Sequence, residues 1–372
     1  MVARVCLVSS GTGGHLWPAL VLGQRLREVG HDTWLVTEGR AVEQDLLARA
    51  GLEADPLPVA AGGPVGFGRA TWAARRMLRE RRAEAVVCTG GRTSLAVGLA
   101  AQSLRLPVFV LEQNAVTGRA NRLLGHFAER VYLGLPNKRL GRRQVLTGTP
   151  LRSEFGRLDR RAARAELGLP TTTPTVFVTG GSQGAQALNQ TAPPALVEVA
   201  RRRGAPLTVV HLSGAGNDAA VRGLYADAAD VGLQAVVRPL ALDMATLYAA
   251  ADVVVCRGGG CTVAELCQSG RASVVVPYPH HRDQQQRRNA EVLVGAGAAR
   301  ILDQAELTPE RLASELVAMF EEPGRLDRMG AAAARLAPAD PCATILADVG
   351  EAVDRHARRG TARHEERHAD RQ

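Results

Sequence analysis

Short apolar runs alternate with longer stretches of helical character along the whole chain. Runs typical of buried strands lie at residues 4–9, 33–37, 85–88, 107–111, 130–133 and 144–146, and again at 175–179, 207–212, 234–237, 253–256 and 272–276. Helical stretches lie at residues 17–29, 94–103, 187–203 and 243–251. Strands that alternate with helices form parallel sheets covered on both faces. The pattern therefore predicts an α/β fold in which each half of the chain is a doubly wound, Rossmann-like domain.

The length of the chain also points to two domains. A chain of 372 residues exceeds what one hydrophobic core usually supports. Apolar periodicity is interrupted near residues 156–173, where arginine, proline and threonine predominate. We therefore expect an N-terminal domain at 1–156 and a C-terminal domain at 157–342. For the tail at 357–372, which mixes histidine with balanced charges, we expect a disordered, solvated end, with a metal-binding tract as the alternative.

The composition is that of an ordinary globular protein, with 46% hydrophobic and 22% charged residues. No apolar run approaches the roughly 18 residues of a membrane-spanning helix, and the short N-terminal run indicates a first strand rather than a signal peptide. The net charge of +9 would suit nucleic acid, but Lys138 is the only lysine and aromatic residues make up 3%. Arginine bias accounts for the charge and few side chains could stack on bases, so we expect no nucleic-acid partner.

The cysteines indicate a reduced protein without a metal centre. They form no C-x-x-C pair, and most lie in or beside apolar runs. Buried, reduced thiols are therefore expected rather than metal ligands. The residues are Cys6, Cys88, Cys256, Cys261, Cys267 and Cys342.

Residues 251–290 carry the most informative group of polar side chains. An apolar run breaks at three glycines, 258–260, and the helical stretch that follows carries one acid, Glu265. A second apolar run ends at Pro277, and beyond it lie Gln284, Gln285, Gln286 and Asn289. Ligands bind at the carboxyl ends of strands in an open α/β sheet. A single carboxylate with a row of amides suits hydroxyl groups, so the segment favours a sugar nucleotide.

A glycine turn follows the first predicted strand. Gly11, Thr12, Gly13, Gly14 and His15 match neither the dinucleotide fingerprint nor a P-loop. Glycines in such a turn let the backbone approach a ligand closely. An imidazole that titrates near neutral pH could then act as a base. The alternative is a tight connection that carries a surface histidine.

A second glycine turn, at residues 180–185, follows the first strand of the second half. Its amides at a helix start, together with the Ser182 hydroxyl, could hold an anion, and a purely structural turn is the alternative. Glu38 ends the second predicted strand, where dinucleotide enzymes hold ribose. Without the full fingerprint, we interpret Glu38 as a helix-capping or surface acid.

Residues 60–84 combine apolar and basic side chains in one helical stretch. An apolar face ringed by arginine could lie on an anionic membrane surface. An ordinary amphipathic helix with a solvated basic face is the alternative. The apolar residues are Phe67, Trp72, Met77 and Leu78, and the basic residues are Arg69, Arg75, Arg76, Arg79, Arg81 and Arg82.

Taken together, these motifs resemble the MurG family, which belongs to glycosyltransferase family 28. The segments that carry the resemblance are GTGGHLWPAL at 11–20, EQNAVTGRANRLL at 112–124, GTPLR at 148–152, GGSQGAQALN at 180–189, DMATLYAAADVVVCRGGGCTVAEL at 243–266 and PYPHHRDQQQRRNA at 277–290. They occur in the family's order over about residues 4–350. Several spaced motifs in register are far more specific than any single glycine turn.

The resemblance implies a GT-B fold, in which two Rossmann-like domains face each other across a deep cleft, without a metal or other cofactor. The final helix, at about 343–356, would pack back onto the first domain. UDP-GlcNAc would bind mainly to the C-terminal domain. Its binding residues would be Thr12, Gly13, Gly14, Arg152, Ser182, Gln183, Gly184, Ala241, Glu265, Gln285, Gln286 and Asn289. The catalytic, acceptor-side residues would be His15, Glu112 and Asn114, with Asn189 beside them.

Individual roles follow from the same resemblance. Ser182 and the following amides, with Arg152, would meet the diphosphate, and Glu265 would accept hydrogen bonds from the ribose. The backbone near Ala241 would bind uracil. Gln285 and Gln286 would bind the GlcNAc hydroxyls, supported by Asn289.

The activity that the resemblance implies is inverting transfer of GlcNAc from UDP-GlcNAc to the C4 hydroxyl of MurNAc in lipid I, which gives lipid II for peptidoglycan synthesis. Partners would be UDP-GlcNAc, lipid I and other cell-wall enzymes, at the cytoplasmic face of the cell membrane, where the protein would be peripheral.

The chain departs from the family pattern at Leu111, at Arg92 and Thr93, and at Thr117, all in the acceptor domain. Three alternatives therefore stay open. They are a GT-B transferase acting on an antibiotic aglycone or a glycolipid, a UDP-GlcNAc epimerase, and a non-catalytic scaffold that binds nucleotide or lipid.

Overall fold

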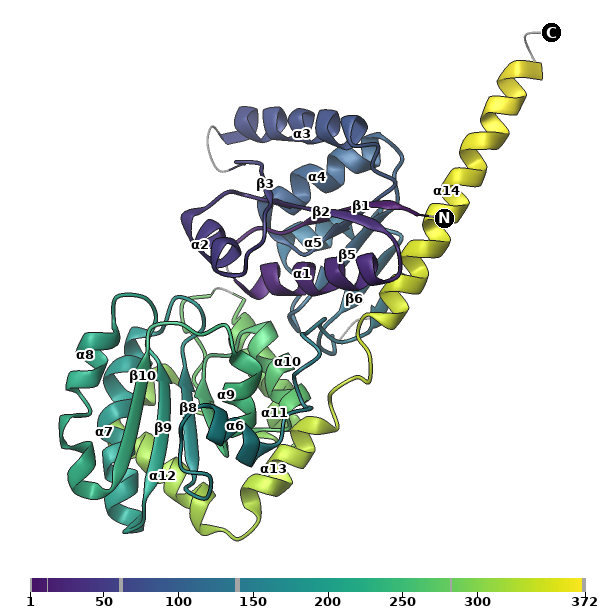
Figure 1. The fold of residues 1–372 in the computed structure, drawn as a ribbon. Coiled ribbons are helices and arrows are strands. Elements are labelled where there is room, and N and C mark those ends of the chain that lie inside the picture. The colour runs from purple at the N-terminus through teal and green to yellow at the C-terminus, as the bar shows by residue number, and fades with distance from the viewer. Residues whose placement is uncertain (1, 12, 60–62, 138–140, 282, 370–372) are drawn as a thin grey trace. The chain divides into compact units, whose positions relative to one another are not determined.

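The computed structural model describes residues 2–11, 13–59, 63–137, 141–281 and 283–369. The chain forms two compact units, each with its own sheet (Figure 1). Unit 1 comprises Met1–Gln113, Thr117–Pro150 and Ala339–Gln372, and unit 2 comprises Asn114–Val116 and Leu151–Pro338.

In the described part of unit 1, seven parallel strands form one sheet in the order β3-β2-β1-β4-β5-β6-β7. The strands are β1 Arg4–Val8, β2 Asp32–Thr37, β3 Asp55–Pro56, β4 Ala85–Cys88, β5 Val108–Glu112, β6 Arg130–Leu133 and β7 Gln144–Leu146. The helices are α1 Gly13–Glu28, α2 Ala41–Arg49, α3 Gly63–Glu80, α4 Gly91–Ser103, α5 Arg119–Leu124 and α14 Ala343–Ala369.

Both faces of this sheet are buried, because side chains alternate along each strand. In β1, Val5 and Leu7 join the core under α1 and α14, whereas Cys6 and Val8 join the core under α3 and α4 (Figure 1). Helix α14 contributes Ile345, Val349, Ala352 and Val353 to the first of these cores, and the Tyr132 hydroxyl donates a hydrogen bond to Asp348 at 2.9 Å. The last helix of the chain is thus part of unit 1, and it continues past residue 356.

In the described part of unit 2, six parallel strands form one sheet in the order β10-β9-β8-β11-β12-β13. The strands are β8 Thr175–Thr179, β9 Leu207–Leu212, β10 Leu233–Arg238, β11 Val253–Cys256, β12 Ala272–Val275 and β13 Ala299–Ile301. The α-helices are α6 Arg160–Glu166, α7 Gln186–Arg203, α8 Asp218–Gly223, α9 Met244–Ala250, α10 Gly260–Ser269, α11 Gln285–Gly295, α12 Pro309–Glu321 and α13 Arg325–Ala334, with the short 3-10 turns η1 Ala226–Val231 and η2 Gln304–Glu306.

The two strand orders confirm the prediction of two doubly wound, Rossmann-like sheets. In each sheet the order reverses next to its first strand, between β1 and β4 in unit 1 and between β8 and β11 in unit 2. Ligands of such sheets bind outside the carboxyl ends of the strands at this reversal. The two glycine turns of the sequence follow β1 and β8, so each turn lies at the reversal point of its own sheet.

The apolar face of the arginine-rich helix α3 is largely buried, unlike the membrane-facing surface considered from the sequence. Ala70, Ala74 and Leu78 are buried in the core of unit 1, and Phe67 and Met77 pack against that core. Most of the apolar face that could have met a membrane is therefore a packing face, because the sheet of unit 1 needs cover on this side. Trp72 remains exposed, at 66% of its surface.

Candidate active site

The glycine turn of unit 2 connects β8 to α7 and requires glycine for steric reasons. Gly184 has φ +71°, and a Cβ added there would lie 2.2 Å from the Ser213 carbonyl oxygen. A Cβ on Gly180 would lie 2.3 Å from the Ala185 amide nitrogen. Ser182 and Gln183 lie between these positions, and Ala185, the residue before α7, makes no side-chain cap. The first amides of this 18-residue helix thus have no side-chain cap from Ala185, and helix starts of this kind can bind anions.

A buried polar network fixes the backbone that this turn packs against. Asn189 Nδ2 donates to the Ser213 carbonyl at 2.8 Å, so Asn189 Oδ1 is an acceptor and takes a hydrogen bond from His211 Nε2 at 3.1 Å. His211 Nδ1 is then free of a proton and accepts from the Tyr225 hydroxyl at 3.1 Å. Burial lowers the pKa of His211 to about 4, so the ring is neutral.

This network corrects the expectation for Asn189. The resemblance placed Asn189 beside the acceptor residues, but its side chain is 6% exposed and both ends of its amide bind within the core of unit 2. Asn189 therefore positions the Ser213 backbone next to the glycine turn.

Glu265 lies on α10, directly after the glycines that follow β11. A Cβ added to Gly258 would lie 2.2 Å from the Gln286 carbonyl oxygen, so the chain comes very close here. Loss of solvent raises the pKa of Glu265 to about 7, while the Tyr248 hydroxyl and the Arg152 guanidinium act in the opposite direction. A carboxylate at this position can accept hydrogen bonds from vicinal hydroxyl groups.

Arg152 and Ala241 are 89 positions apart in the sequence. One hydrogen bond places Arg152 next to the residue that follows Ala241. Arg152 Nη1 donates to the carbonyl oxygen of Leu242, the next residue after Ala241, at 2.5 Å. The Arg152 guanidinium also acts electrostatically on Glu265. The loop after β10, Arg152 and Glu265 are therefore parts of one region of unit 2, as a nucleotide site requires.

The amides predicted on α11 divide into scaffold and surface groups. Asn289 is fully buried, and its Nδ2 donates to the Gly258 carbonyl at 2.9 Å and to Asn114 Oδ1 at 3.0 Å, while its Oδ1 accepts from the Ala115 amide at 2.8 Å. Gln286 Oε1 accepts from the Gly258 and Tyr278 amides at 3.2 and 3.0 Å. Gln285 begins the helix and is partly exposed. Asn289 thus supports the loops, whereas Gln285 and Gln286 lie at the surface.

Arg257 is a residue of this region that the sequence motifs did not single out. It is 8% exposed, and its Nη1 donates to the Val276 and Pro277 carbonyls at 3.0 and 3.3 Å. Its Nη2 donates to Gln304 Oε1 at 2.7 Å. Arg257 thereby fixes the segment that follows β12 and leads to the glutamines. An arginine placed directly after an apolar run was the available signal.

His15 lies in the first turn of α1, at the reversal point of unit 1. Its Nδ1 is 2.7 Å from the Thr89 carbonyl oxygen and 3.0 Å from Gln113 Oε1. A carbonyl oxygen can only accept, so Nδ1 carries the proton and the neutral ring keeps its lone pair on Nε2. A Cβ added to Gly90 would lie 2.9 Å from His15 Cε1. Contacts within unit 1 therefore set the tautomer and orientation of the His15 imidazole.

The rest of the first glycine turn is held by α2. Gly11 donates its amide hydrogen to Glu43 Oε1 at 2.8 Å, and Glu43 is buried. Gly13 begins α1 and Gly14 follows it, whereas Thr12 lies outside the described residues. Glu43 was missed in the sequence, although its Oε2 also accepts from the Arg40 amide at 3.0 Å, at the start of α2.

Glu112 ends β5 and holds the loop that carries Asn114. Its Oε2 accepts from the Gly118 amide at 2.8 Å and from Asn121 Nδ2 at 2.9 Å, and the side chain is 1% exposed. Such a carboxylate fixes the loop from within. Glu38, interpreted as a capping or surface acid, is in fact 5% exposed and forms an ion pair with Arg40 at 2.6 Å.

No group of three or more His, Cys, Asp or Glu in the described part of the chain could hold a metal ion. Among the helices of the described part, none is both long and apolar enough to cross a bilayer.

Comparison with known proteins identifies the family. Residues 5–133 match the glycosyltransferase family 28 N-terminal domain, and residues 175–341 match the family 28 C-terminal domain. A protein of Xanthomonas axonopodis pv. citri named UDP-N-acetylglucosamine--N-acetylmuramyl-(pentapeptide) pyrophosphoryl-undecaprenol N-acetylglucosamine transferase is 41% identical over 355 residues, covering 93% of this chain and 81% of its own length. A protein of the same name from Sorangium cellulosum is 38% identical, covering 94% and 88%.

Solved structures agree with these relatives. The crystal structure of MurG from Acinetobacter baumannii superposes with a TM-score of 0.78 at 30% identity, covering 94% of this chain and 99% of that one. A putative UDP-N-acetylglucosamine 2-epimerase from Listeria monocytogenes has a TM-score of 0.66 at 15% identity, covering 93% and 95%, which shows a shared fold alone. The chain therefore has the two-domain GT-B fold and belongs to glycosyltransferase family 28, in the MurG family.

Proposed function

We propose that this protein transfers N-acetylglucosamine from UDP-GlcNAc to lipid I and so produces lipid II for peptidoglycan synthesis. The single observation that carries the proposal is the shared name of relatives about 40% identical over most of both chains. The geometry of unit 2 supports it, because Glu265, Arg152 and an uncapped helix start suit a nucleotide diphosphate.

The donor half of the proposal assigns one task to each group. The first amides of α7 and Ser182 bind the diphosphate together with Arg152, and Glu265 accepts from the ribose hydroxyls. Backbone near Ala241 binds uracil. Gln285 and Gln286 bind the sugar, on a surface that Asn289 and Arg257 keep in place. As the leaving diphosphate gains negative charge, the helix start and Arg152 stabilise that charge.

The acceptor half assigns proton removal to His15. The acceptor's C4 hydroxyl loses its proton to His15 Nε2 while its oxygen attacks the anomeric carbon of GlcNAc, and the bond from that carbon to UDP breaks on the opposite face. One displacement converts an α-linked donor into a β-linked product. Glu112 and Asn114 act by holding the 113–118 loop beside the muramyl sugar, so in this proposal Glu112 is a positioning residue.

UDP release tests the proposed reaction. We expect UDP release from UDP-GlcNAc to depend on a lipid I analogue and to persist in EDTA, because protein groups supply the positive potential at the diphosphate. Soluble aglycones serve as the competing acceptors. Faster turnover with an aglycone, or conversion of the donor without any acceptor, would instead support an antibiotic transferase or an epimerase. Binding of UDP-GlcNAc without UDP release would indicate a scaffold.

We further propose that unit 1 binds the cytoplasmic face of the cell membrane peripherally through the exposed side of α3. Val65, Arg69, Trp72 and Arg76 are exposed, and their spacing of four, three and four residues puts them on one side of the helix. Val65 and Trp72 are each 66% exposed. Two apolar side chains that alternate with two arginines suit the boundary between headgroups and acyl chains.

Vesicle sedimentation checks this surface. Trp72→Ser is expected to weaken binding to phosphatidylglycerol vesicles roughly tenfold, because the variant lacks the large apolar side chain that transfers from water into the bilayer. Leu224→Ser, which changes a residue 48% exposed on unit 2, is the matched control and should bind as the wild type does. Equal binding by Trp72→Ser and the wild type would remove α3 from the membrane surface.

A further inference from the structure

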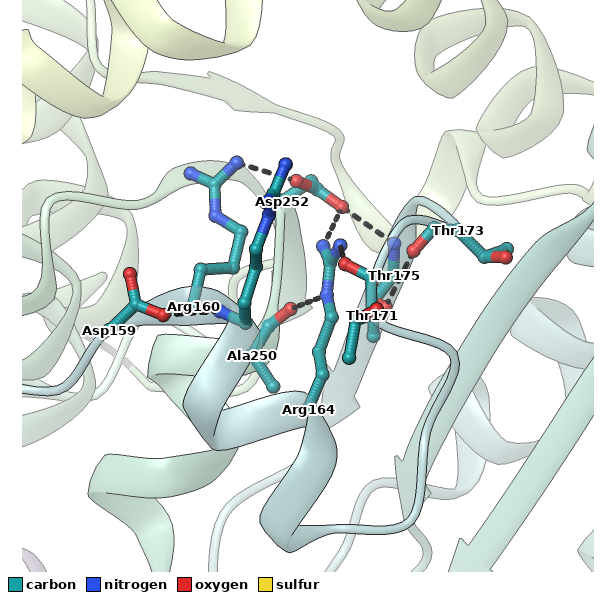
Figure 2. Close-up of polar contacts among 9 residues, drawn as sticks. Asp159, Arg160, Arg164, Thr171, Thr173, Thr175, Ala250 and Asp252 are labelled. Atoms are coloured by element: carbon teal, nitrogen blue, oxygen red, sulfur yellow. Dashed lines mark hydrogen bonds and ion pairs between the residues drawn. The ribbon is translucent and has the colours of Figure 1, made fainter.

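A cluster of arginines surrounds Asp252 at the amino-terminal edge of the sheet in unit 2 (Figure 2). Asp252 precedes β11, Arg271 precedes β12, and Arg160 and Arg164 come from α6. Because the strands are parallel, this edge is the one away from the proposed donor residues, at a distance on the order of 15 Å along the strands. The cluster therefore has no part in the proposed transfer.

Asp252 accepts hydrogen bonds on both of its carboxylate oxygens (Figure 2). Its Oδ1 accepts from Arg160 at 2.8 Å, and its Oδ2 accepts from Arg164 at 2.5 Å and from the Thr175 amide at 2.6 Å. Arg164 is equally satisfied, because its Nε donates to the Ala250 carbonyl and its Nη1 to the Thr171 carbonyl, at 2.9 and 3.0 Å. Arg164 and Asp252 thus form a closed structural pair.

Beside this pair lies Arg271, whose Nε makes no hydrogen bond to the described residues. It is 9% exposed, and its Nε is buried. Burial lowers the pKa of Arg271 to about 10, and the charges of Arg160 and Arg164 act in the same direction, against Asp252 and Asp327. Arg203, on which Asp252 also acts, has a buried Nη1 with no partner among the described residues.

The charges of the cluster do not balance. Arg160, Arg164, Arg203 and Arg271 face two carboxylates, Asp252 and Asp327. A buried charge that lacks an opposite charge and hydrogen bonds is costly. A dianion would offset the excess of positive charge. Guanidinium groups match the oxygens of a phosphate in pairs, and the Arg160 side chain, 38% exposed, gives access from water.

We propose that this cluster is a binding site for a small phosphate-type oxyanion, with Arg271 and Arg160 as its direct contacts. The bound ion joins α6 to the start of β12, and it therefore stabilises unit 2 against unfolding. The occupant is inorganic phosphate or the phosphate of a small monoester, because both present the same oxygens to the two guanidinium groups.

Thermal unfolding of the full-length protein tests the site. The measurement is made with saturating UDP, so that the diphosphate site is already occupied, in phosphate and in chloride at equal ionic strength. Phosphate is expected to raise the Tm of the wild type by roughly 2–6 °C over chloride. Arg271→Gln should abolish this rise. Arg311→Gln, which changes an exposed arginine paired with Glu315 on α12, should keep it.

Arg160→Gln is the second variant, because its exposed position tolerates substitution if Arg271→Gln fails to fold, and it too should lose the phosphate-dependent rise. Glycerol phosphate replaces phosphate in a parallel series. A larger rise with glycerol phosphate assigns the site to a monoester, and a larger rise with phosphate assigns it to the free ion. The proposal is overturned if the wild type unfolds at the same temperature in phosphate and chloride, or if Arg160→Gln keeps the full rise.

Discussion

Replacing His15 with alanine is expected to lower kcat by about 10²–10⁴-fold while the KM for UDP-GlcNAc stays unchanged. The expectation rests on the proton held at Nδ1 by the Thr89 carbonyl, 2.7 Å away, which leaves Nε2 as the basic atom. The loss falls on kcat because a base acts in the transition state, whereas the proposed donor contacts lie in unit 2.

A second variant separates a base from a merely structural histidine. His15→Gln keeps a side chain of similar polarity but cannot take up a proton, so it should be as slow as His15→Ala. Retention of wild-type kcat by His15→Gln would exclude the imidazole from proton transfer.

Replacing Glu265 with glutamine is expected to raise the KM for UDP-GlcNAc by about 10–100-fold, because hydrogen bonds from the ribose to a charged acceptor are lost. The pKa of Glu265, raised to about 7 by burial, adds a pH dependence. Ribose hydroxyls bind the ionised form best. In the wild type the KM for the donor should therefore rise as the pH falls below 7, and in Glu265→Gln this dependence should disappear.

The same substitution is expected to stabilise the protein at pH 8. The folded-state pKa of Glu265, about 7, lies above its ordinary value of 4.5, so the stability associated with its proton is present below pH 4.5 and is lost as pH rises toward 7. Glu265→Gln should thus raise the free energy of unfolding by about 2–3 kcal/mol at pH 8 and change it little at pH 4.5.

His211 affects the pH dependence of stability in the opposite direction to Glu265. Its pKa is lowered from 6.5 to about 4, so the stability it contributes is complete above pH 6.5 and is lost as pH falls toward 4. In the wild type the two groups offset each other over much of this range. Glu265→Gln should therefore lose stability more steeply than the wild type as pH falls.

Denaturant unfolding across this pH range measures both effects. Glu291→Gln, which changes an exposed acid on α11, is the control and should follow the wild type. A Glu265→Gln variant that is no more stable than the wild type at pH 8, or that binds the donor with unchanged KM, would contradict the proposed role of Glu265.

Most of the fold follows from short-range patterns in the sequence. The apolar runs predicted the two sheets, and the glycine turns marked where each sheet reverses. The helices α2, α5, α6, α8, α11, α12 and α13 and the short strands β3 and β13 were not predicted. For α13 the reason is physical, because its run of alanines at 331–334 carries no contrast between apolar and polar positions from which a period can be seen.

The polar residues were harder to assign, because a motif shows the type of a side chain but not what it binds. Asn189 belongs to a family motif, yet its amide is used by Ser213 and His211. From the sequence, Phe67 and Met77 could equally belong to a membrane-binding face. In the structure they pack against the core of unit 1. No local pattern distinguishes these outcomes, since the partners lie far away in the chain.

The sequence by itself determined the two-sheet architecture, the glycine turns and the family, since periodicity, steric demand for glycine and motif order are all local or collinear properties. Only the tertiary structure decided which polar groups are available to a ligand and which form hydrogen bonds within the protein. It set the tautomer of His15 through the Thr89 carbonyl and placed Arg271 beside an aspartate whose carboxylate accepts hydrogen bonds from other residues. Such states depend on desolvation and on contacts between distant segments, and these exist only after the chain has folded.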